Sequence, residues 1–120
     1  MVSPLTRTHG LVDGVRVHLR LTRRSDLAAL RALLDRRGIE ASDEALRELL
    51  DFHPADRAVL CAFAPLGGSP TLVGIGAVDL AAGHEPDTLV VDERLARGVG
   101  ELLVSELDAR VRMRARRAAA

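Results

Sequence analysis

The segment from residue 89 to residue 103 constrains this chain most, because two hydrophobic periodicities meet in it. A continuous apolar run predicts a short strand over residues 88–91, in a central position of a sheet. Gly98 and Gly100 follow in a tight turn, and apolar residues at helical spacing predict an amphipathic helix over 98–117. A strand that turns directly into a helix aims free backbone N–H groups at one point, where the helix dipole favours an anion such as phosphate.

The rest of the pattern predicts a single mixed domain. Alternation of apolar and polar residues predicts a strand over 15–21, and capping residues begin two helices near Asp26 and at Ser42. Two further strands follow, which a Pro- and Gly-rich turn joins into a hairpin (57–64 and 71–80). The expected fold is α/β (α+β): two layers, a mostly antiparallel sheet packed with helices, in the order β-α-α-β-β-β-α. We expect a flexible leader over 1–13, one domain over 14–117 and a tail over 118–120.

Glycine also interrupts one of the predicted strands. Gly74 and Gly76 lie inside the segment 71–80. Glycine at such positions indicates a bulge or a close approach of another part of the backbone.

Composition narrows the chemistry available to the chain. Its 120 residues carry 17 basic and 17 acidic side chains, so net charge argues neither for nor against nucleic acid. Every basic residue except histidine is Arg, and Tyr is absent, which leaves four His, the carboxylates and one thiol for acid–base work. A bacterial genome of high GC content explains this bias.

The one cysteine, Cys61, lies in an apolar strand and is expected to be a buried core residue rather than a nucleophile. A single cysteine also favours a reducing, cytoplasmic location. No segment predicts a signal peptide or a membrane span. No His or Cys spacing indicates a metal site.

Three stretches carry a resemblance to a known family: 17–30, 72–78 and 91–103. The first resembles the opening strand and acidic-capped first helix of the GNAT superfamily, the acetyl-CoA-dependent N-acetyltransferases. The second resembles the family's third strand, and the last its motif A, the pyrophosphate-binding loop. The resemblance covers about residues 15–117 and implies acetyl-CoA as cosubstrate and a small amine or peptide as acetyl acceptor.

Carried over residue by residue, the resemblance implies a cofactor site. The two small positions of motif A fall on Gly98 and Gly100, and Arg97 would face phosphate, but Leu95 stands where the family has Arg or Gln. Residues 89–91 match the family's fourth strand, whose backbone pairs with the pantetheine arm and polarises the thioester carbonyl. The implied cofactor-binding residues are Leu89, Val90, Val91, Arg97, Gly98, Val99, Gly100 and Glu101.

The candidate general bases are His84 and Glu85, with Asp79 and Asp87 nearby, since the family's base often falls near the ends of these strands. Histidine there would titrate near neutrality. The same residues are also typical of a polar surface turn with no catalytic role. The family continues beyond the resembling part with further strands and often a Tyr that protonates the leaving thiolate.

Two other functions remain open from the sequence. One is a non-catalytic, shortened GNAT-like module in assembly or regulation, which could form a homodimer through an exposed sheet edge. The other is nucleic-acid binding by five arginines between Arg110 and Arg117. Their spacing distributes charge around the whole helix and no aromatic residue is interleaved, which disfavours this reading.

Overall fold

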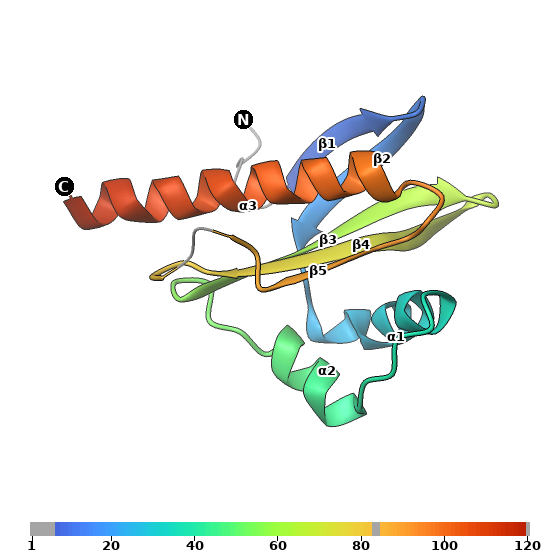
Figure 1. Cartoon of the computed structure of the whole chain (residues 1–120), viewed down its shortest axis with the longest axis horizontal. Coiled ribbons are helices and arrows are strands. Elements are labelled where there is room, and N and C mark those ends of the chain that lie inside the picture. The colour runs from blue at the N-terminus through green and yellow to red at the C-terminus, as the bar shows by residue number, and fades with distance from the viewer. Residues whose placement is uncertain (1–6, 83–84, 120) are drawn as a thin grey trace.

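The computed structural model describes residues 7–82 and 85–119 and shows a five-stranded antiparallel sheet with helices on both faces (Figure 1). The strands lie in the sheet in the order in which they occur in the chain, and each neighbouring pair is antiparallel. The elements are β1 (Arg7–Val12), β2 (Val15–Leu21), a short 3₁₀ turn (Arg24–Asp26), α1 (Leu27–Arg36), α2 (Asp43–Leu50), β3 (Arg57–Leu66), β4 (Ser69–Asp79), β5 (Thr88–Val91) and α3 (Ala96–Ala119).

Residues 7–12 form a strand where the sequence predicted a flexible leader. The reason is the turn at Asp13 and Gly14, whose φ angles are 50° and 80°. Two consecutive residues with positive φ form the tight hairpin turn that matches strand twist, so Val12 pairs directly with Val15. The added strand changes the predicted element order to β-β-α-α-β-β-β-α.

The two short helices confirm the start predicted at Ser42 and the helix predicted after Asp26. The Ser42 hydroxyl accepts a hydrogen bond from the Ala45 N–H, and α2 begins at the next residue. Gly38, with φ of 67°, follows the end of α1. Both helices pack on one face of β3 and β4, where their leucines meet Val59, Cys61 and Ile75.

The prediction of two layers is wrong, because α3 covers the opposite face of the sheet. Strand β3 shows why: Ala58, Leu60 and Ala62 face α3, whereas Val59 and Cys61 face α1 and α2. A strand that is apolar on both faces needs a helix layer on each. Figure 1 shows the resulting three layers, with α3 on one side of the sheet and α1 and α2 on the other.

Strand β5 has the predicted boundaries but lies at the edge of the sheet rather than in its centre. Its apolar run is explained by partial burial on both faces: Val91 packs with the α3 core and Val90 with the α1 core. Leu89, in contrast, remains 44% exposed. Among the described strands, none pairs with the outer edge of β5.

Helix α3 packs closely on the sheet, because glycines occupy positions of β4 and α3 where the two elements meet. A Cβ atom added at Gly74 would lie 2.7 Å from Val99 Cγ1, and one at Gly76 would lie 3.0 Å from Leu107 Cδ1. The sequence predicted a bulge or a close backbone approach at these glycines. The register of β3 and β4 does shift next to Gly74, between Ala62 and Phe63, and what approaches both glycines closely is the side chains of α3 rather than another backbone. On the helix itself, a Cβ at Gly98 would overlap Val12 Cγ1 of β1.

α3 has 24 residues. No helix in the described part of the chain combines the length and apolarity that a membrane span requires.

The glycines of α3 give a matched test of this packing. Gly98→Ala should destabilise the fold by about 1–3 kcal/mol, because the added methyl group overlaps Val12. Gly100→Ala should stabilise it by up to about 1 kcal/mol, because a Cβ there meets open space and alanine favours the helix. Urea unfolding followed by circular dichroism measures both. Equal effects of the two substitutions would contradict this packing.

Candidate functional site

An open groove runs between the edge strand β5 and helix α3. Its volume is about 460 Å³. Leu89 and Pro86 line the strand side, and Val104 and Val111 line the helix side, so most of the wall is apolar. Arg97, Gly100 and Glu101 lie at the end where α3 begins. The groove thus joins an apolar channel to a helix N-terminus.

The backbone of β5 presents hydrogen-bonding groups to this open edge. The N–H of Asp92 donates to Val73 O at 2.7 Å, which fixes the phase of the β4–β5 ladder. Hydrogen-bonded pairs alternate along an antiparallel ladder, so Val90, opposite Ile75, bonds to β4. Leu89 and Val91 consequently direct their N–H and C=O groups outward. The edge therefore offers donors and acceptors in the pattern of a missing strand.

The first turn of α3 supplies further donors. The N–H groups of Ala96, Arg97 and Gly98 make no backbone hydrogen bond to another residue in the ranges 7–82 and 85–119. Such N–H groups carry the partial positive charge of the helix dipole. The side chains of Arg94 and Arg97 are both largely exposed beside them. Among the described residues that line this end of the groove, Arg97 is the one cation, and it lies 3.5 Å from Glu101.

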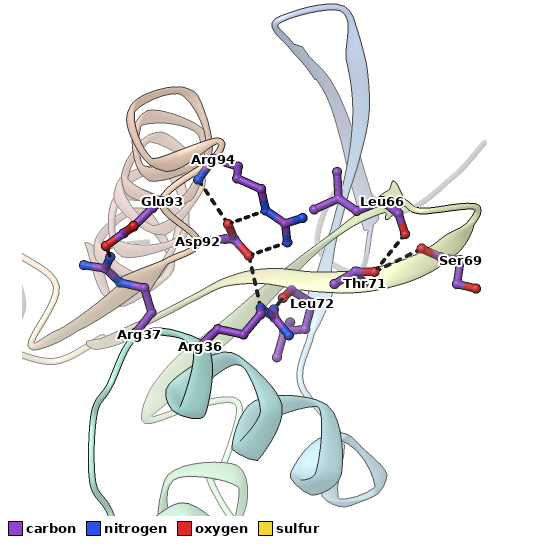
Figure 2. A network of polar contacts seen from close by, with 9 residues as sticks. All are labelled: Arg36, Arg37, Leu66, Ser69, Thr71, Leu72, Asp92, Glu93 and Arg94. Atoms are coloured by element: carbon purple, nitrogen blue, oxygen red, sulfur yellow. Dashed lines mark hydrogen bonds and ion pairs between the residues drawn. The ribbon is translucent and has the colours of Figure 1, made fainter.

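A buried carboxylate fixes the turn between β5 and α3, as Figure 2 shows. Asp92 is only 4% exposed and accepts the backbone N–H of Arg94 at 3.0 Å. It also accepts two side-chain hydrogen bonds from Arg94, at 3.0 and 2.9 Å. Arg36, at the end of α1, donates to it at 3.2 Å and to the Leu72 carbonyl of β4 at 2.6 Å. Asp92 thereby ties α1, β4 and the start of α3 together.

The electrostatics of this cluster follow from its hydrogen bonds. The bond from Arg94, more than any other interaction, holds the pKa of the Asp92 carboxyl well below its usual range. Two guanidinium groups face one carboxylate, so the cluster keeps an excess positive charge beside the helix N-terminus. A second pair, Arg37 with Glu93 at 2.5 Å, lies next to it on the surface (Figure 2).

The predicted cofactor residues divide between groove and core. Leu89, Arg97, Gly100 and Glu101 line the groove. Val99 lies on the inner face of α3 and is fully buried. The other three residues also face the protein interior. Val90 lies on the α1 face of the sheet, Val91 packs against α3, and Gly98 packs against β1. The two glycines of the motif thus face opposite ways, and only Gly100 opens into the groove.

Of the two predicted bases, Glu85 lies exposed in the turn before β5, and His84 lies outside the described residues. The neighbouring carboxylates hold structure instead. Asp87 makes two 2.6 Å hydrogen bonds with Arg57, and Asp79 accepts the N–H groups of Ala81 and Ala82. The groove itself contains the carboxylates of Glu101 and Asp108.

Sequence reasoning missed Asp92 and Arg36 as site residues. The signal for Asp92 was its position two residues before an arginine at the end of a strand, since aspartate accepts the N–H two residues on in such turns. Arg36 gave no signal, because 56 residues separate it from its partner.

The thiol and the acidic residues offer no alternative site. Burial raises the pKa of Cys61 to about 12, so the thiol stays protonated and unreactive. Within the described ranges, no three His, Cys, Asp or Glu side chains gather in a way that could hold a metal ion.

Comparison with known proteins adds no relative: no family model, no curated protein and no solved structure matches the chain.

The Asp92 cluster predicts a pH-dependent stability. Asp92→Asn should destabilise the protein by about 2 kcal/mol at pH 7, because it removes charge-assisted hydrogen bonds from a buried position. The folded pKa is lowered, so this contribution is complete above the unfolded-state value of about 4 and is lost as the pH falls below it.

Urea unfolding of both proteins between pH 7 and pH 2 measures the difference, which should shrink at the acid end. Glu93→Gln is the matched control, because it removes an exposed pair and should change stability by less than about 1 kcal/mol. A difference between wild type and Asp92→Asn that is constant over the pH range would disprove the role of the charge.

Proposed function

We propose that this domain binds acetyl-CoA and transfers the acetyl group to an amine, as a GNAT-like acyltransferase. The observation that carries the proposal is the groove itself: one apolar channel connects the N-terminus of α3, whose first N–H groups bond to no described residue, to the outward-facing backbone of β5. A cofactor with an anionic diphosphate and a long amide-containing arm needs both features side by side.

The residues present fit the two parts of such a cofactor. The diphosphate matches the N–H groups of residues 96–98 and the exposed side chains of Arg94 and Arg97. The pantetheine arm alternates apolar and amide groups, which matches a wall of Leu89 and Val104 beside the free backbone groups of β5. The volume of about 460 Å³ lies within the usual range for ligand sites, about 300–1,000 Å³.

In this proposal, each residue has a simple task. Acetyl-CoA supplies an activated acetyl group. The outward N–H of Val91 donates a hydrogen bond to the carbonyl oxygen that gains negative charge when the amine attacks. The proton that the amine releases passes through solvent water to Glu85, which is exposed before β5 but does not line the groove. Asp92 positions Val91 and the helix N-terminus through its contacts with Arg94 and Arg36.

Calorimetric titration with acetyl-CoA tests binding. Wild type should bind saturably and gain about 2.7 kcal/mol of stability at a ligand concentration of 100 Kd. Gly100→Glu should weaken binding at least tenfold, because it places a carboxylate in the groove without touching the core. Gly100→Ala, which adds only a methyl group in the same open position, should bind as wild type does. Absence of binding by wild type, or equal binding by the Glu variant, would refute the cofactor proposal.

A second candidate function is assembly: a second copy of this chain adds its own β5 to the open edge. The specific observation in its favour is the exposure of Leu89 (44%) and Val104 (39%) on the same groove. Antiparallel pairing about a two-fold axis would also bring Arg97 of each copy toward Asp108 of the other, because they lie near opposite ends of the helix face that lines the groove. Both functions need the same edge, so they exclude one another.

Sedimentation equilibrium separates the two functions. Assembly predicts a dimer that Val104→Glu converts to a monomer, because the substitution puts a charge at the centre of the interface. Ile39→Glu is the matched control, since Ile39 is also 39% exposed but lies away from the groove. A monomeric wild type, or an Ile39→Glu variant that dissociates equally, would refute assembly through this edge.

A further inference from the structure

A second cavity lies at the other end of α3, between its C-terminal half and the segment before β3. Its volume is about 600 Å³. It shares no described lining residue with the groove beside β5. In Figure 1, this is the end where α3 extends over the start of β3 and the end of β4. The cavity is therefore independent of the proposed acetyl-CoA site.

The floor of this cavity is apolar. Leu21 at the end of β2, Leu80 just after β4 and Met113 of α3 line it, together with the buried Ala58. None of these side chains carries a charge or a hydrogen-bond donor. The floor can therefore accept the apolar body of a ligand, and excludes a strongly hydrated one.

The wall is basic. Arg110, Arg114 and Arg117 recur at spacings of four and three residues, so they lie on one face of α3 and line the cavity together. His53 lines the opposite side. No Asp or Glu is found among the described lining residues. Two of these groups do have a carboxylate nearby: Glu106 lies 3.8 Å from Arg110, and Asp56 lies 4.0 Å from His53.

Two of these arginines are already held in place. Arg110 has a side chain that is only 10% exposed, and burial lowers its pKa, which means that its charge is poorly solvated. Arg114 donates from Nε to the Ala55 carbonyl at 3.2 Å, which fixes it against the segment before β3. Arginines that are fixed before binding lose little side-chain entropy when an anion arrives.

Neutralising the helix dipole does not explain this arrangement. Cations at the end of α3 offset the dipole wherever they point. Arg112 and Arg116 serve that purpose as well, yet neither lines the cavity, and Arg112 pairs with Asp108 on another face. The three arginines that converge on the apolar floor therefore indicate a ligand.

We propose that this cavity binds an amphiphilic organic anion, a single anionic group carried on an apolar body. The anionic group would bind between Arg114 and Arg117, and the apolar body would cover Leu80 and Met113. The volume corresponds to a small ligand rather than a polymer. This site is separate from acyl transfer, and its existence does not depend on the proposed function.

Titration with n-octyl phosphate, below its micelle concentration, tests the site in the full chain by calorimetry. We expect saturable binding of this probe, and at least tenfold weaker binding of inorganic phosphate and of n-octanol, which each carry half of its chemistry. Octanoate should bind within tenfold of octyl phosphate if the anionic group and the apolar body are recognised together. Inorganic phosphate that binds as tightly as octyl phosphate would overturn the proposal.

Matched arginine variants locate the binding. Arg114→Gln and Arg117→Gln should each weaken octyl phosphate binding at least tenfold, whereas Arg112→Gln should leave it unchanged. Arg117 is exposed, so Arg117→Gln should keep the fold. It therefore still tests the site if Arg114→Gln unfolds through loss of the bond to the Ala55 carbonyl. Equal weakening by Arg112→Gln and Arg117→Gln would show diffuse charge attraction and overturn the site.

Discussion

The close seating of α3 on the sheet is the constraint on which the rest of the structure depends. Gly74 and Gly76 remove the side chains that would hold the helix away from β4, and Gly98 removes the one that would meet Val12. The helix can therefore bury Val99, Leu103 and Leu107 completely. Its position in turn sets the width of the groove beside β5 and places the cavity at its far end. Methyl groups added at these glycines would hold α3 further from the sheet, expose part of this core and alter both the groove and the cavity.

The buried Asp92 decides how α3 begins. In α2 the cap is ordinary: Ser42 accepts the Ala45 N–H of the first turn. Before α3, the Asp92 carboxylate accepts the backbone N–H of Arg94 and side-chain bonds from Arg94 and Arg36, and the N–H groups of residues 96–98 keep no acceptor among the described residues. A protein normally satisfies such groups with its own side chains, because leaving them unpaired costs free energy. Water satisfies such groups at many helix starts, and in the proposed complex the diphosphate would take its place.

The sequence predicted local structure well and long-range arrangement poorly. Strands 15–21 and 88–91 and the helix start at Ser42 follow from alternation and capping, which act over a few residues, and they are confirmed. The edge position of β5 and the third layer depend on which faces meet across the whole chain, and neither follows from local periodicity.

The candidate site shows the same division. Gly100 and Arg97 were found from a motif and do line the groove, but Gly98 serves packing against Val12, a contact between residues 86 positions apart. Arg36 could not be found, because only the fold brings α1 to Asp92. A motif thus identified the right segment, whereas the three-dimensional contacts assign different tasks to its individual residues.

Residue-resolved amide hydrogen exchange tests the central claim most directly, which is that β5 offers an open edge to acetyl-CoA. In the free protein, the Val91 amide should exchange rapidly and the Val90 amide slowly, because of these two residues Val90 bonds to β4 and Val91 faces the open edge. Saturating acetyl-CoA should slow exchange at Val91, Arg97 and Gly98 and leave Val90 unchanged. A Val91 amide that stays fast with acetyl-CoA, or is already protected without it, would contradict the account.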